Sequence, residues 1–100
     1  MPELLNHETL TKQLNTKFAL IDSAEPLELE LIEVTEPTVT TSQTYFSLYF
    51  LGNKDYPLPQ GTYRMNHARL GETLIFLVPT ARDADGCKYE SVFNLLNQPT

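Results

Sequence analysis

Asp83, Asp85 and Gly86 form the stretch of the chain whose residue types come closest to a metal-binding loop. In calcium loops of this kind, oxygen ligands recur at alternate positions and a bidentate glutamate closes the site. Here Ala81 stands two residues before Asp83, and Val92 stands six residues after Gly86, where ligands are needed. We therefore expect an Asx-rich turn at this place, with no metal and no cofactor.

Cys87 follows that turn and could act as a nucleophile if a histidine approached it. The two histidines, His7 and His67, are both distant from it in sequence. A lone cysteine at the start of a strand is more often a small hydrophobic residue, and these three side chains are too few for zinc unless carboxylates join them. We expect no catalytic residue and no enzymatic activity.

Glutamates recur through one segment, at Glu25, Glu28, Glu30, Glu33 and Glu36. They could form a docking surface for a basic partner. The interpretation that we favour is a solvated outer strand face that resists the addition of further strands. Alternation places these carboxylates in water, where nothing raises a pKa, so we do not expect an acid–base pair.

The segment from Thr44 to Leu51 is the centre of the scaffold that must position these residues. It is apolar on both faces, which is typical of a central β-strand. One side carries Phe46, Leu48 and Phe50, and the other carries Tyr45, Tyr49 and Leu51. A second run, Leu74 to Val78, has the same character and is expected to be its neighbour.

The remaining pattern predicts a short helix over about residues 6–15, ending at a left-handed Asn15, and about six strands. The strands are expected at about 17–22, 27–35, 44–51, 61–67, 72–79 and 88–95. The alternation slips by one residue at Leu31 and Ile32, which predicts a β-bulge. Short links favour an antiparallel meander, curled as a small barrel or a sandwich, in a mainly β (α+β) single domain over residues 1–100.

Residue type predicts two local structural roles in the same scaffold. Gly61 is expected to supply a positive φ in the turn after Pro59. Pro79 is expected to end its strand, because it has no N–H for the hydrogen-bond ladder.

The 100 residues carry a net charge of −6, with a pI near 4.7. Such a charge argues against nucleic acid and against an anionic membrane surface as partners. The N-terminus has no basic region followed by a long apolar core, and no apolar run approaches a membrane span. A single cysteine fits a reducing compartment. We expect a cytoplasmic protein.

The C-terminal half contains a fairly distinctive series of motifs. They are Leu58-Pro-Gln-Gly-Thr-Tyr-Arg64, Leu70 to Pro79, Arg82-Asp-Ala-Asp-Gly86 and Tyr89-Glu-Ser-Val-Phe-Asn94. This half resembles a family of small bacterial proteins of unknown function that occur near genes for tail-collar-type fibre proteins. The resemblance implies a fold and a setting, and it implies no reaction.

The surplus of apolar side chains gives the functional expectation. If the interior is filled by Phe46, Leu48, Phe50, Leu74, Phe76 and Val78, other large residues must be covered elsewhere. An outer contact surface is then predicted at Tyr45, Tyr49, Leu51, Ile75 and Leu77. The alternative is that the helix and the loop over residues 52–60 cover them as a lid.

Two functions follow from this reading. The first is a non-enzymatic interaction or structural accessory module that binds a protein partner or a second copy of itself, in tail-like or fibre-like assembly. The second is a small-molecule-binding β-barrel with a cavity lined by Phe46, Phe50, Tyr63, Met65 and Phe76.

Overall fold

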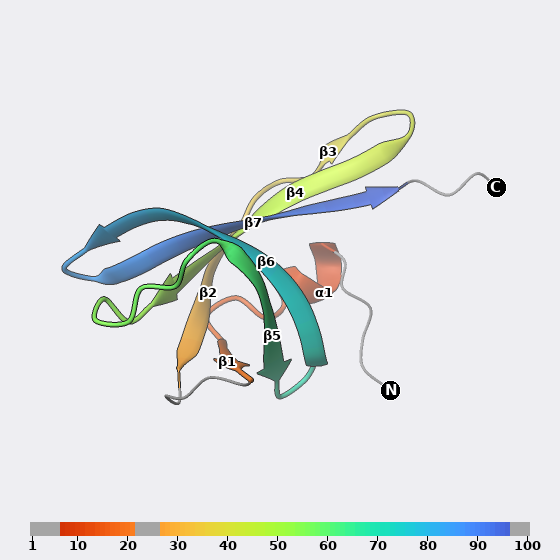
Figure 1. Cartoon of the computed structure of the whole chain (residues 1–100). Coiled ribbons are helices and arrows are strands. Elements are labelled where there is room, and N and C mark those ends of the chain that lie inside the picture. The colour runs from red at the N-terminus through yellow and green to blue at the C-terminus, as the bar shows by residue number, and fades with distance from the viewer. Residues whose placement is uncertain (1–6, 22–26, 97–100) are drawn as a thin grey trace.

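The computed structural model describes residues 7–21 and 27–96, with the side chains of residues 94–96 left aside. One short helix, α1 (His7–Thr11), precedes seven strands (Figure 1). The strands are β1 (Lys17–Leu20), β2 (Glu28–Val34), β3 (Thr38–Val39), β4 (Gln43–Gly52), β5 (Gly61–His67), β6 (Gly71–Asp83) and β7 (Gly86–Leu96). Asn6, Asp22, residues 23–26, where a turn is expected from the sequence, and residues 97–100 lie outside the described residues.

Six of the strands close into an antiparallel barrel. The strand order is β2-β1-β5-β6-β7-β4-β3, and an additional pairing of β2 with β4 completes the ring. Of the two expected alternatives, a barrel or a sandwich, the structure is the barrel. Two short meanders make up the ring, β1-β2-β4 and β5-β6-β7, and the chain crosses between them from β4 to β5. The ring is closed by the pairs β1–β5 and β4–β7. These strands are not consecutive in the chain, so a meander of consecutive hairpins did not predict their pairing.

The central strand, the bulge and the left-handed residue are confirmed. β4 pairs with β7 over its whole length and with β2 on its other side. The register of β2 against β4 shifts between Leu31 and Glu33, at the predicted slip in the alternation. Asn15 has φ 66°. The helix ends at Thr11 and not at Asn15 as expected, and residues 12–15 form turns.

β6 and β7 are longer than predicted. Pro79 does not end its strand: β6 continues to Asp83, and the register against β7 shifts between Pro79 and Ala81. An irregularity is where a strand tolerates a residue that cannot donate an N–H. The expected loop over residues 80–87 is instead a tight turn before Gly86, which has φ 142°, whereas Gly61 is not among the residues with positive φ.

The strand next to β4 was also wrongly predicted. The run from Leu74 to Val78 lies in β6, and β7 stands between it and β4. Its phase is inverted as well, because Ile75 and Leu77 are 1% and 0% exposed, whereas Leu74 and Phe76 are 64% and 46% exposed. The run is apolar at every position, so either phase would satisfy an alternating pattern, and pairing with β5 decides which side faces inward.

The core fills the barrel with side chains from all six strands of the ring. Its largest members with almost no exposure are Phe18, Leu31, Leu48, Phe50, Met65, Ile75, Leu77 and Tyr89. Phe18 and Phe50 meet edge to face, with ring centroids 5.3 Å apart, a favoured aromatic geometry. A hydrophobic interior of this size accounts for a stable domain without disulfide bonds.

α1 covers one end of the barrel, beside β2. Leu10 is fully buried, and the His7 ring packs edge to face on Phe46 with centroids 5.1 Å apart. Figure 1 shows β4 and β7 continuing past this end as a ribbon that also carries β3. β6 pairs with β7 only from Val78 to Asp83, so these two strands diverge where the ribbon begins.

Candidate functional site

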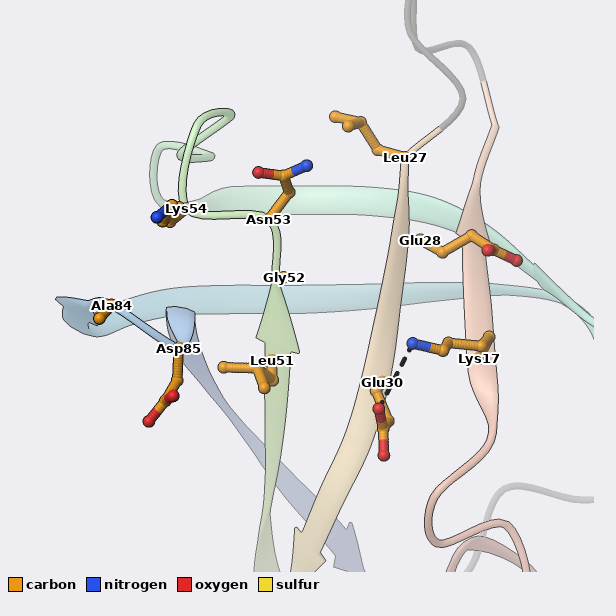
Figure 2. Close-up of a pocket in the computed structure, with 10 residues that line it drawn as sticks. All are labelled: Lys17, Leu27, Glu28, Glu30, Leu51, Gly52, Asn53, Lys54, Ala84 and Asp85. Carbon is orange, nitrogen blue, oxygen red and sulfur yellow. Dashed lines mark hydrogen bonds and ion pairs between the residues drawn. The ribbon is translucent and has the colours of Figure 1, made fainter.

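A polar pocket of about 450 Å³ lies at the other rim of the barrel (Figure 2). It is bounded by β1, β2, the end of β4 and the turn between β6 and β7. Lys17 on β1 and Glu30 on β2 form an ion pair on one side of it, with Nζ and Oε1 3.3 Å apart. Figure 2 shows the Asp85 carboxylate and this ion pair on opposite sides of Leu51. The charges therefore do not converge on one point, as a catalytic or anion-binding site would require.

The Asp83–Gly86 turn uses its acids internally. The Asp85 N–H donates to Asp83 Oδ1 at 2.8 Å, which is the hydrogen bond of an Asx turn. In the described part of the chain, no three His, Cys, Asp or Glu side chains are placed to hold a metal ion together.

Cys87 and the two histidines have different neighbours. Cys87 is 3% exposed, and its Sγ lies 4.0 Å from the Lys54 carbonyl oxygen. His7 Nε2 lies 3.0 Å from the Thr35 carbonyl oxygen at the helical end. The thiol and the His7 imidazole therefore contact different carbonyl oxygens, and no contact between them is observed.

His67 is a buried structural histidine, 4% exposed. Its Nδ1 accepts from the Arg69 and Leu70 N–H groups at 3.0 and 3.2 Å, so the proton belongs on Nε2. Nε2 lies 2.8 Å from Thr16 Oγ1, whose own proton goes to the Gln13 carbonyl oxygen. Burial lowers the pKa of His67, and the charge of Arg69 lowers it further. The ring is held neutral as a bridge between β5 and the turn before β1.

The outer face of the sheet carries an ordered carboxylate. Glu90 Oε2 accepts from Ser47 Oγ at 3.0 Å and from Tyr49 Oη at 3.1 Å. The hydrogen bond to Glu90 raises the pKa of Tyr49, and burial and the negative charges of Glu90 and Glu33 act in the same direction. Glu90 and Tyr49 face each other across β7 and β4, and Glu33 on β2 faces Tyr49 from the other side.

Beside these residues lies an apolar surface, which we name the outer apolar patch. It consists of the exposed Leu74, Phe76 and Val92 and the half-buried Val78. Leu74, Phe76 and Val78 occupy alternate positions of β6, so they share its outer face. Val78 pairs with Glu90, and Val92 lies on the same face of β7, two residues further on, with 59% exposure. Clustered apolar side chains on an outer strand face contribute nothing to the barrel interior and are typical of contact surfaces.

The predicted contact residues are divided between the core and the surface. Tyr45 is 38% exposed on β4, and Tyr49 and Leu51 are half-buried on the same outer face. Ile75 and Leu77 lie in the core, so placing them on an outer surface was wrong. Their neighbours on β6 take that position instead. Leu74 and Phe76, which were expected in the interior, are the exposed apolar residues of this run.

The residues proposed to line an internal ligand cavity are also divided. Phe46, Phe50 and Met65 are buried in the packed core, and Tyr63 packs against it. Phe76 points outward, so it cannot line an interior site.

The loop over residues 52–60 covers the barrel in part. Leu58 packs against the core, and its N–H donates to Tyr89 Oη at 2.8 Å, whereas Tyr56 is 45% exposed. Burial raises the pKa of Tyr89. An apolar groove of about 440 Å³ runs beside this contact, between Pro57–Pro59 and Pro79–Arg82. Sequence reasoning did not find the groove, because it depends on two segments that meet only in the fold.

These features define a class: a small, closed, antiparallel β-barrel with a helix at one end and a mixed apolar and acidic outer face. The chain matches the family described as "Domain of unknown function (DUF6916)" over residues 5–93, and it belongs to that family. No curated protein and no solved structure matches it. No helix in the described part of the chain has the length and apolarity needed to cross a membrane.

Proposed function

We propose that this domain is a non-enzymatic interaction module that docks a protein partner on the outer apolar patch. The observation that carries the proposal is the exposure of Leu74 and Phe76 on the outer face of β6, at 64% and 46%, together with that of Val92 on the outer face of β7, at 59%. Fully burying a side chain of this size stabilises a contact by about 1.5–3 kcal/mol, so a partner that covers the patch gains several kcal/mol. An interface centre of this kind is apolar and bears an aromatic residue.

The setting that we propose is bacterial and cytoplasmic, where the domain acts as an accessory in the assembly of a tail-like or fibre-like structure. Support for this part comes from the sequence motifs of the C-terminal half, which resemble those of proteins encoded near tail-collar-type fibre genes. The single cysteine fits a reducing compartment.

Affinity purification from the native cell tests the docking surface. Tagged wild type is compared with Phe76→Ser and with Val39→Ser, a matched control at a 68%-exposed residue on β3. We expect the wild type and Val39→Ser to retain the same protein and Phe76→Ser to lose it, while all three unfold at similar temperatures. Equal retention by all three, or by none, contradicts the proposal. Mass spectrometry of the retained protein tests the link to fibre assembly separately.

A further inference from the structure

A row of side chains crosses four strands on the outer face. Val78 on β6 pairs with Glu90 on β7, Glu90 pairs with Tyr49 on β4, and Tyr49 pairs with Glu33 on β2. Residues that pair across antiparallel strands point to the same face. The outer apolar patch therefore meets two carboxylates and a tyrosine ring at its edge.

The Glu90 carboxylate is held in place and remains available to a ligand. Both hydroxyl donors, from Ser47 and Tyr49, act on Oε2, and Oε1 makes no hydrogen bond with the described side chains, which are those of residues 7–21 and 27–93. An oriented carboxylate with a free oxygen loses little entropy when it accepts a charged donor.

Glu90 and Glu33 form no ion pair with a described cation. Lys12, Lys17 and Arg64 pair with Glu8, Glu30 and Glu72. Lys88 lies on the same face of β7, two residues before Glu90, yet forms no ion pair with Glu90 or Glu33 among the described residues. Two acids without a bound cation beside an apolar patch favour a ligand that brings its own positive charge.

We infer that the partner presents an arginine or lysine flanked by aliphatic side chains, the cation binding Glu90 and Glu33 over the Tyr49 ring and the aliphatic groups covering the outer apolar patch. This inference rests on the proposed function and names the chemistry of its partner. A cation above a tyrosine ring adds a cation–π attraction. A second copy of this chain fits less well, because it would bring the same acids and a further net charge of −6 to the contact.

A pair of peptides tests the inference by NMR titration of the ¹⁵N-labelled domain. The probe is acetyl-Thr-Leu-Arg-Val-Thr-amide, and its control replaces arginine with citrulline, which has nearly the same shape and no charge. We expect the arginine peptide to shift the amides of Ser47, Tyr49, Glu90 and Val92. Citrulline should weaken binding by about tenfold, and added salt should weaken the arginine peptide alone.

Variants separate the charge from the apolar contact. Glu90→Gln keeps acceptors for Ser47 and Tyr49 and should lose about tenfold in affinity for the arginine peptide, whereas the exposed control Glu36→Gln should not. Equal binding of both peptides, or no shift at these amides, overturns the inference. If both peptides bind equally and Phe76→Ser abolishes that binding, the outer apolar patch is a docking surface, and the partner needs no cation. A dimer in sedimentation equilibrium that Phe76→Ser dissociates overturns the basic partner in favour of a second copy.

Discussion

Thr73 is a buried residue of β6 whose hydroxyl oxygen has no hydrogen-bond partner among the residues that the structure describes. Its side chain is on the inner face, 8% exposed, in line with Ile75 and Leu77. A hydroxyl that is removed from water without a partner costs more than it contributes.

Replacing this hydroxyl with a methyl group should stabilise the barrel. We expect Thr73→Val to raise the free energy of unfolding by about 1 kcal/mol, because valine has nearly the same shape and nothing to desolvate. Urea unfolding measures the change. The control is Thr62→Val on the outer face of β5, where a change close to zero is expected. A loss of stability in Thr73→Val would show that the hydroxyl is satisfied in solution.

His67 should make the fold sensitive to mild acid. Its folded pKa lies below the unfolded value of about 6.5, so the unfolded chain binds the proton more readily. The contribution of His67 is then fully present above about pH 6.5 and is lost as the pH falls toward the folded pKa. Unfolding followed at several pH values between about 7 and 5 should show a steeper loss for wild type than for His67→Gln. Parallel curves for the two proteins contradict this assignment.

At the scale of elements, β6 shows how one strand serves the core and the surface at once. Ile75 and Leu77 face Tyr63 and Gly61 on β5 and lie inside, while Leu74 and Phe76 face Arg64 and Thr62 and lie outside. A strand that is apolar on both faces promotes aggregation when its edge is free to pair with another chain. The edges of β6 are occupied where it pairs with β5 and β7.

Substitution of adjacent residues on β6 should therefore give opposite results. Ile75→Ala should cost about 2–5 kcal/mol by leaving a cavity in the core. Phe76→Ala should change the free energy of unfolding by less than about 1 kcal/mol, because its ring is 46% exposed. Thermal or urea unfolding compares the two variants. A larger loss from Phe76→Ala would mean that the outer face is covered within a single chain.

In the whole molecule, the closed ring determines which backbone hydrogen bonds are the last to break. β4 is hydrogen-bonded to β2 and to β7 between Leu48 and Leu51, whereas β3 is a two-residue strand at the edge of the ribbon. Backbone groups that pair on both sides inside a core open only with global unfolding.

Amide hydrogen exchange should follow this division. We expect the slowest exchange at Leu48 and Phe50 on β4 and fast exchange at Thr38 and Val39 on β3, and two-dimensional NMR after dilution into D₂O resolves both. If the amides of Thr38 and Val39 exchanged as slowly as those at the centre of β4, the ribbon would unfold together with the barrel. That result would contradict the prediction, because β3 pairs with β4 alone.

Much of the fold could be predicted from local pattern. The alternation in residues 27–35 predicted β2, its slip at Leu31 predicted the bulge, and the two-faced run predicted β4 as a central strand. The outer apolar surface was also expected. Its residues on β6 were placed in the wrong phase, since Leu74 and Phe76 are as apolar as Ile75 and Leu77.

The sequence by itself determined a small acidic domain with one helix, antiparallel strands and more apolar side chains than one interior could hold. Only the tertiary structure decided which side of β6 faces the core, and it placed β7 between β4 and β6. It also brought Ser47 and Tyr49 to Glu90, residues 43 and 41 positions apart in the chain. The physical reason is that alternation along a strand defines two faces, while long-range hydrogen-bond pairing decides which face is buried and which side chains become neighbours.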